Sequence, residues 1–427
     1  MSALTGNETS LFKNRNYLLL FSAQIVSLTG SGVTTVGLAV FAYQMAGGAS
    51  AAAIIGNALT LRILAFLLFS QPSGVLADRF NRKTILVMAD VLRFGLLMLF
   101  PLVSQIWHIY VLIFAINAVT AFFTPTFEAM IPEVAGEKHY VKALSLSRVA
   151  VDIEALAAPA LAGLLLVWLG VRWVFWFDAL TYLLSAVLVL MSSIRHVPAS
   201  RTPFSVHALI SELTYGTRVI LREASLRQAI VLSFVEATAG AAAIVATVVY
   251  VKDVLAHSET AFALVMASLG LGSSMTALIL GKMTGRYESA SMGRAELHWR
   301  RHRWTGIGLI AGGTILGLLL LPGIWQPPLL VFAFLWMLNG AGQALIAIPS
   351  TTLLAEHTSE KERGRVYAAH FALTHACWLI TYPAIGHGVA RFGAPATFSI
   401  AGVVCLAITL AAYWFKPFIH QGHTHEP

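Results

Sequence analysis

Charged residues are scarce in this sequence. Lys, Arg, Asp and Glu make up 11% of its 427 residues, whereas soluble globular proteins carry about 25%. Hydrophobic residues make up 57%. A chain with so few polar groups cannot cover a surface that faces water, so lipid must surround most of it. The composition excludes an ordinary soluble enzyme and predicts a protein embedded in a membrane.

The sequence also has little cysteine and none of the common catalytic motifs. Its two cysteines, Cys377 and Cys405, both fall within apolar runs, which argues against a disulfide framework. The metalloprotease pattern H-E-x-x-H, the hydrolase pattern G-x-S-x-G and the nucleotide-binding P-loop are absent from the sequence. We therefore expect neither an enzyme nor a self-contained ATP pump, and no resident cofactor.

Long apolar runs are abundant. A helix needs about 20 apolar residues to cross a bilayer. The runs predict an all-α membrane protein with twelve transmembrane helices. They lie at 16–45, 51–76, 84–103, 107–133, 143–168, 172–193, 226–252, 260–283, 304–322, 328–354, 364–388 and 393–415.

Lys and Arg are distributed unevenly over the connections between these runs. With the N-terminus in the cytoplasm, 23 of the 28 Lys and Arg residues fall on the cytoplasmic side, three fall outside, and two, Arg62 and Arg93, lie within spans. Positive residues mark cytoplasmic loops, so we expect both termini in the cytoplasm. The net charge of +8 then reflects membrane topology, and no nucleic-acid partner is expected.

The predicted spans form two similar halves. Pro125 and Pro349 lie 224 residues apart, and Pro159 and Pro383 are separated by the same number. This register indicates a duplicated set of six spans, an architecture used by alternating-access transporters. The predicted parts are an N-terminal half (1–193), a cytoplasmic linker with an amphipathic helix near 206–223 (194–225), a C-terminal half (226–415) and a His-containing cytoplasmic tail (416–427).

The connection between the second and third spans carries a compact motif, Gly74-Val-Leu-Ala-Asp78-Arg79-Phe-Asn-Arg82-Lys83. The glycine permits close helix packing, and Asp78 can cap a helix end. The motif resembles the G-x-L-a-D-R-x-x-R-K signature of the major facilitator superfamily. That resemblance implies a twelve-helix secondary transporter in which this loop, with Asp78 and Arg79, latches the outward-facing state. The alternative is a charge cluster that only sets membrane topology.

A charged pair is expected just beyond this loop. Asp90 and Arg93 lie three residues apart in the third span and can meet on one helix face. We expect a structural pair that supports the latch. A direct contact with substrate is the alternative.

Two other patterns resemble a narrower branch of the superfamily. Phe122–Pro125 with Ile131–Glu133, and Phe177–Tyr182, are similar to segments of exporters that include macrolide-efflux, siderophore-export and nickel-resistance proteins. The run Ala157–Gly163 looks like a reduced form of the antiporter motif G-P-x-x-G, or else provides small residues for tight packing. The resemblance implies efflux.

Acidic residues inside predicted spans are the candidates for ion coupling. They are Asp152, Glu154, Asp178 and Glu236. A carboxylate in lipid is costly, so each suggests a function. We expect Asp152 and Glu236 to carry a proton or cation. A structural hydrogen-bonded pair is the alternative for each of them.

Histidine marks the eleventh predicted span. His370 and Cys377 lie on one helix face with Thr374 and Thr381, whereas His375 lies on another. Imidazole and thiolate suit nickel, zinc, copper or cobalt. His370 and Cys377 are separated by about 10.5 Å along a helix. A metal site would therefore need ligands from other spans, with Glu236 or Asp152 as candidates, or the two residues would act as successive binding positions. Metal transit is the first interpretation of this stripe, and a proton relay and plain packing are the alternatives.

The C-terminal tail holds a second histidine cluster, His420, His423 and His425. Imidazoles at this spacing bind Ni²⁺ with modest affinity. Together with the eleventh span, the tail makes the sequence similar to the nickel-resistance exporters of this branch. Chance enrichment of histidine in a polar tail is the alternative.

These features predict a proton-coupled secondary exporter in the bacterial inner membrane, acting as a monomer on a small substrate. The resemblance and the histidines favour a divalent metal ion, with nickel before cobalt or iron. The alternative is export of a hydrophobic drug, such as a macrolide, or of a siderophore.

Overall fold

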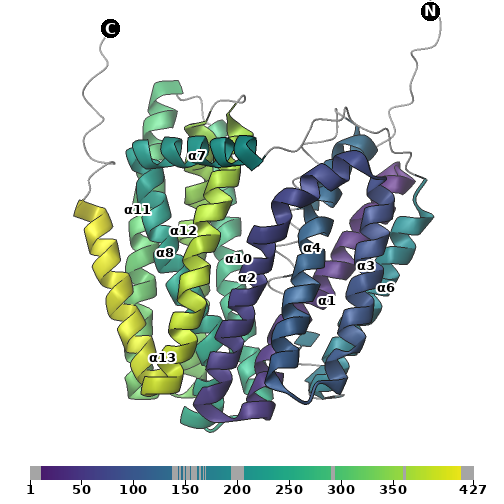
Figure 1. Cartoon of the computed structure of the whole chain (residues 1–427). Coiled ribbons are helices and arrows are strands. Elements are labelled where there is room, and N and C mark those ends of the chain that lie inside the picture. The colour runs from purple at the N-terminus through teal and green to yellow at the C-terminus, as the bar shows by residue number, and fades with distance from the viewer. Residues whose placement is uncertain are drawn as a thin grey trace, which may run out of the picture. The chain divides into compact units, whose positions relative to one another are not determined.

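The computed structural model describes residues 11–136, 170–193, 206–289, 294–358 and 362–414, with a scatter of residues between 143 and 168 (Figure 1). All regular structure in these ranges is helical. Ten described helices are long and apolar enough to span a membrane. The predicted all-α membrane fold is therefore confirmed.

The ten candidate spans are compatible with the twelve predicted. The last of them, Arg365–Trp414, contains two predicted spans. It belongs to α13 (Arg363–Trp414), which is interrupted at Gly393, where φ is +78°. Glycine tolerates this left-handed conformation without a Cβ clash. The fifth predicted span, 143–168, lies largely outside the described residues.

The chain divides into two compact units. Unit 1 comprises Met1–Gly37 and Leu64–Pro203, and unit 2 comprises Leu38–Ile63 and Phe204–Pro427. The predicted boundary between the halves, at 193 and 226, stays a prediction. Unit 1 contains parts of α1 (Arg15–Ala46) and α2 (Gly48–Arg79), and it contains α3 (Arg82–Met98), α4 (Ile106–Ala135) and α6 (Val171–Met191).

Unit 2 contains most of the remaining helices. They are α7 (Val206–Arg222), α8 (Ala224–Ala241), η4 (Ala242–Ala246), α9 (Thr247–Val249), η5 (Tyr250–Val254), α10 (Glu259–Ser289), α11 (Arg294–Leu320), η6 (Leu321–Trp325), α12 (Leu329–Glu356) and α13. The seventh predicted span runs from α8 to η5 and includes two π-helical stretches, η4 and η5. Such stretches inside membrane helices often occur at functional sites.

The outer end of the first helical hairpin belongs to unit 2 because its backbone packs closely on α13. A Cβ built on Gly56 would lie 2.6 Å from the carbonyl oxygen of Tyr382, and one built on Gly386 would lie 2.7 Å from that of Ala52. Only glycine allows helices to approach this closely. Segment 38–63, called the outer hairpin below, is thus fixed to α13 by two glycines.

The amphipathic helix predicted near 206–223 is confirmed as α7. Figure 1 shows it lying across one end of the helices of unit 2. A Cβ built on Gly216 would lie 2.4 Å from the carbonyl oxygen of Arg365. The Tyr215 hydroxyl donates a hydrogen bond to Glu362, and the Arg365 guanidinium lies 4.3 Å from the centre of the Tyr215 ring. These contacts hold α7 on the start of α13.

Candidate transport site

The predicted pair of Asp90 and Arg93 forms inside unit 1. Both side chains are buried, and the Arg93 guanidinium donates to Asp90. The Ser185 hydroxyl on α6 donates a second hydrogen bond to Asp90, at 2.7 Å. The guanidinium lies 4.2 Å from the ring centre of Phe123 and 4.1 Å from that of Tyr182. Three helices thus enclose a compensated charge pair, as expected of a structural role.

Asp178 is also satisfied by neighbours within unit 1. Its carboxylate is buried, and the Thr181 hydroxyl lies 3.2 Å from its Oδ1 atom. A Cβ on Gly30 would lie 2.2 Å from the same oxygen, so α1 must present a glycine there. A second polar contact joins these helices nearby, since the hydroxyls of Ser31 and Tyr182 lie 2.9 Å apart. The carboxylate of Asp178 therefore helps to join α1 to α6.

The motif between α2 and α3 is described only in part. Gly74, Asp78 and Arg79 lie in the last turns of α2, and their side chains fall outside the described set. Arg82 begins α3 and donates to the Glu133 carboxylate at 2.5 Å. This ion pair joins the start of α3 to the end of α4, where Glu133 belongs to the first exporter-like pattern.

Two further contacts fix the start of α3. The Asn81 side chain caps the helix by accepting hydrogen bonds from the backbone of Lys83, at 3.0 Å, and of Thr84, at 3.4 Å. At the end of α6, the Lys83 ammonium donates to the carbonyl oxygens of Leu190, at 2.8 Å, and of Ser192, at 2.6 Å. The cytoplasmic ends of α3, α4 and α6 are therefore tied together, while the latching role of the loop stays a prediction.

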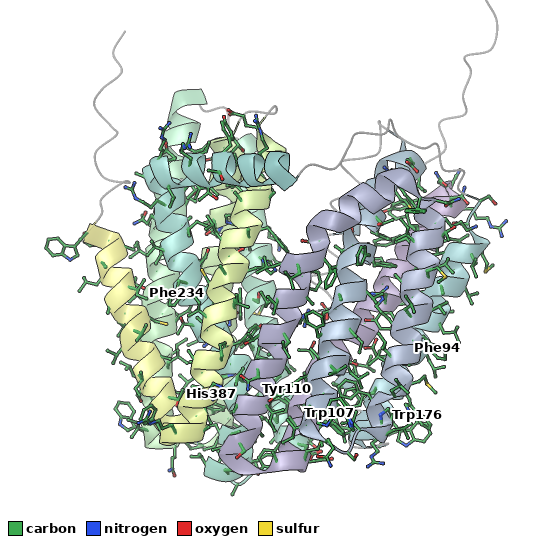
Figure 2. The ribbon with its side chains drawn as sticks, viewed as in Figure 1. Phe94, Trp107, Tyr110, Trp176, Phe234 and His387 are labelled. Atoms are coloured by element: carbon green, nitrogen blue, oxygen red, sulfur yellow. The ribbon has the colours of Figure 1, made fainter. Side chains whose placement is uncertain are left out.

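Glu236 differs from the acids of unit 1. It lies on α8, two residues after Phe234, which Figure 2 shows near mid-height of unit 2. Its side chain is half-buried, and within the described ranges it makes no hydrogen bond or ion pair. Its carboxylate is within electrostatic reach of the Cys377 thiol on α13. The other acid predicted to couple ions, Asp152, lies outside the described residues.

Aromatic and amide groups surround the next turn of α8. A Cβ built on Gly240 would lie 2.3 Å from the Trp378 indole and 3.2 Å from the Gln343 amide oxygen. The rings of Trp378 and Tyr382 are 5.0 Å apart. The amide of Gln343 donates to the Asn339 side chain at 2.7 Å. Sequence reasoning missed these residues, because apolar periodicity does not show which helix faces which.

The predicted metal ligands of α13 bind mainly to their own helix. His375 contacts the Phe371 carbonyl oxygen through Nδ1 at 2.8 Å, and Cys377 donates to the Leu373 carbonyl oxygen at 3.3 Å. The buried Nε2 atom of His370 has no hydrogen-bond partner among the described groups. Within the same ranges no set of three His, Cys, Asp or Glu residues could hold a metal ion. The tail ligands His420, His423 and His425 lie outside those ranges.

Arg62 adds a positive charge to this region. It lies on the part of α2 that belongs to unit 2, within electrostatic reach of His375 and Tyr382. Arg62 could have been recognised from the sequence as a candidate functional residue, because a charged residue inside a span is unusual. Its neighbours on α13 could not be read from the sequence.

A polar cluster at the outer face of unit 2 was not predicted at all. The Tyr43 hydroxyl donates to the Asp253 carboxylate, and the Lys252 ammonium pairs with Glu259 at 2.9 Å. The Gln44 amide donates to Glu259 at 3.1 Å, and the Lys252 ammonium lies 4.4 Å above the Tyr43 ring. These residues join the outer hairpin to the end of the seventh span and the start of α10.

Comparison with known proteins defines the family. The sequence profile of the Major Facilitator Superfamily matches residues 20–297 and 291–425. The uncharacterized MFS-type transporter YfiS of Bacillus subtilis (strain 168) is 24% identical over 412 residues, which cover 94% of each chain. Macrolide efflux protein A of Streptococcus pyogenes is 26% identical over 154 residues, covering 35% of this chain and 37% of that protein.

Solved structures agree in fold. A POT family transporter in complex with 5-aminolevulinic acid matches with a TM-score of 0.74 at 13% identity, covering 96% of this chain and 98% of that one. The nucleoside transporter NupG matches with a TM-score of 0.71 at 13% identity, covering 94% and 98%. At such identities the likeness shows the fold alone. The profile match and the fold together show that this chain, a multi-pass membrane transporter and not an enzyme, belongs to the major facilitator superfamily.

Proposed function

We propose that the protein exports a hydrophobic organic compound of the macrolide kind, driven by protons. The observation that carries this proposal is the similarity to Macrolide efflux protein A over 154 residues. The exporter-like patterns at Phe122–Pro125 and Phe177–Tyr182 support it. Organic export, first considered as the alternative, thus becomes the main hypothesis, because nickel has no comparable support among the relatives.

Proton coupling is assigned to Glu236. The Asp90 carboxylate is neutralised by Arg93 and Asp178 is hydrogen-bonded within unit 1. Glu236 has no such partner among the described residues, so its proton can be exchanged without breaking a structural contact. Asp152 stays the second candidate for the coupling site.

Metal export is the second candidate function. One observation favours it: the Nε2 atom of His370, on the same span as His375 and Cys377, has no hydrogen-bond partner among the described groups. A Ni²⁺ site would require further ligands. These would have to come from residues outside the described set, such as Asp152 or the tail.

The experiment measures accumulation of radiolabelled erythromycin in bacteria that lack their own drug exporters. We expect cells that express the protein to accumulate less erythromycin, and a protonophore to abolish the difference. Glu236→Gln should remove export at equal protein abundance in the membrane. Glu223→Gln, the same substitution at the cytoplasmic end of the same helix, should retain it.

Growth of the same strains on nickel, cobalt and iron separates the two candidates. If expression raises metal tolerance and leaves erythromycin accumulation unchanged, the metal hypothesis replaces the organic one. His370→Ala and deletion of 420–427 would then test the histidines separately.

A further inference from the structure

Glu236 is a carboxyl group at membrane depth that has no charged or hydrogen-bonding partner among the described residues. Each carboxylate that the structure shows buried in unit 1 has a cation or hydroxyl beside it, as Asp90 has Arg93 and Asp178 has Thr181. Glu236 has neither within the described ranges, although its side chain is half-buried. An unpaired charge at this depth is costly. A ligand that brings a positive charge would offset that cost.

The surroundings of Glu236 on the helix are aromatic. Glu236 and Gly240 are four residues apart and therefore lie on the same face of α8. The space that a side chain at Gly240 would need is occupied by the Trp378 indole, which lies 5.0 Å from the Tyr382 ring. Trp and Tyr ring faces attract cations, Trp most strongly. The indole thus packs against α8 at Gly240, one helical turn along that helix from Glu236.

The other groups near this turn are neutral. The Gln343 amide approaches Gly240, and the Thr381 hydroxyl is engaged with the Ala237 carbonyl oxygen at 3.2 Å. The Cys377 thiol is the group within electrostatic reach of Glu236, whereas Arg62 acts on Tyr382 and His375. Among the side chains that the structure describes, none therefore offers the Glu236 carboxyl group a positive charge.

We propose that Glu236 and Trp378 form the recognition site for a hydrophobic organic cation, a protonated amine or a quaternary centre attached to an apolar body. The carboxylate supplies the counter-charge, and the indole supplies the apolar and cation-binding surface. This inference rests on the proposed export function and narrows its substrate class. A divalent metal ion would need several hard or soft ligands together, whereas an organic cation needs one charge and an aromatic face.

Charge discrimination tests the site directly. Tetraphenylphosphonium and triphenylphosphine oxide present similar phenyl surfaces, but only the first carries a charge. Their binding to the purified full-length protein in lipid nanodiscs is measured by isothermal titration calorimetry. We expect Glu236→Gln to weaken tetraphenylphosphonium binding by at least about tenfold, while the affinity for triphenylphosphine oxide stays within about twofold. Glu236→Asp should restore most of the lost affinity.

Three further variants test the aromatic part and control for unfolding. Trp378→Ala should weaken the binding of both compounds, because it removes the shared apolar surface. Trp325→Ala, at an exposed position on η6, should change neither, and Glu223→Gln should bind both like the wild type. Each variant is used only if its thermal unfolding in the nanodisc matches the wild type.

The inference is overturned if Glu236→Gln binds tetraphenylphosphonium as tightly as the wild type does. It is also overturned if that variant loses both compounds equally, since this would indicate a packing role. Failure of the export proposal looks different. In that case erythromycin accumulation is unchanged by expression, while the charge-dependent binding of tetraphenylphosphonium persists.

Discussion

The hydroxyl of Tyr43 donates a hydrogen bond to the carboxylate of Asp253, 210 residues further along the chain. This contact joins the outer hairpin, segment 38–63, to η5 within unit 2. The Lys252 ammonium, paired with Glu259, lies above the same Tyr43 ring. The hairpin is therefore held at its outer end by a polar cluster and along its length by glycine packing.

Tyr43→Phe should loosen the outer hairpin. The change removes the hydrogen bond to Asp253 and keeps the ring beneath Lys252. A hydrogen bond to a charged group contributes about 1.5–3 kcal/mol when shielded, and this one is largely accessible, so we expect about 1 kcal/mol. Amide hydrogen exchange measured by mass spectrometry should become about fivefold faster in segment 38–63.

The matched control is Tyr413→Phe, at an exposed position near the end of α13. It should leave exchange in the outer hairpin unchanged. Equal exchange in Tyr43→Phe and the wild type would show that the hydrogen bond does not hold the hairpin.

Arg93→Ala should destabilise unit 1 strongly. It leaves the buried Asp90 carboxylate with the Ser185 hydroxyl as its remaining described partner and empties the space between two aromatic rings. Breaking a buried ion pair by removing one partner costs about 3–5 kcal/mol. The melting temperature of the purified protein should fall clearly, and by less in the double variant Asp90→Asn/Arg93→Gln, which leaves no charge unpaired.

The control for this charge removal is Arg172→Gln, because Arg172 is exposed at the start of α6. It should melt like the wild type. If the double variant is no more stable than Arg93→Ala, the unpaired Asp90 carboxylate is not what destabilises Arg93→Ala, and the explanation by a broken buried ion pair fails.

The pair of Asp90 and Arg93 shows which contacts can be predicted from the sequence and which cannot. Spacing of three residues was enough to place both groups on one face of α3. Phe123 and Tyr182, which enclose the guanidinium, come from α4 and α6 and could not be found, because hydropathy does not determine helix packing in lipid. The same limit applies to α13. Its periodicity placed His370 and Cys377 on one stripe, but not the Trp378 indole against Gly240.

The outer hairpin illustrates a second limit. The sequence repeat assigns residues 38–63 to the N-terminal half, whereas their contacts group them with unit 2. Covalent order and hydropathy carry no signal for this grouping. The contacts that group these residues with unit 2 depend on two glycines and on polar residues at loop ends. The lengths of the apolar runs give no information about such contacts.

The docking of α7 should be lost at high pH. The hydrogen bond to Glu362, and secondarily burial, raise the pKa of Tyr215 above 10.0. A group whose pKa is raised in the folded state contributes stability that is complete below its unfolded pKa and is lost as the pH rises through the folded value. Docking should thus be constant up to about pH 10 and weaken above it. Bimane fluorescence on Thr217→Cys, at the α7 surface, would report the release.

Tyr215→Phe provides the control for this titration. Without the phenol there is no hydrogen bond to Glu362 and no proton to lose. We expect weaker docking at neutral pH and no further release above pH 10. A release that persists unchanged in Tyr215→Phe would assign the titration to another group.

Gly56→Ala should disturb the packing of α2 on α13. The added Cβ would lie 2.6 Å from the carbonyl oxygen of Tyr382, a backbone atom that cannot move aside without shifting the helix. Overpacking of this kind costs about 1–3 kcal/mol. We expect a lower melting temperature, faster hydrogen exchange in segment 38–63 and reduced erythromycin export.

Gly281→Ala is the matched control, because a Cβ there meets nothing within 4 Å. If Gly56→Ala melts and exchanges like Gly281→Ala, the close approach of Gly56 to α13 does not fix the hairpin, and the polar cluster around Tyr43 must hold it alone.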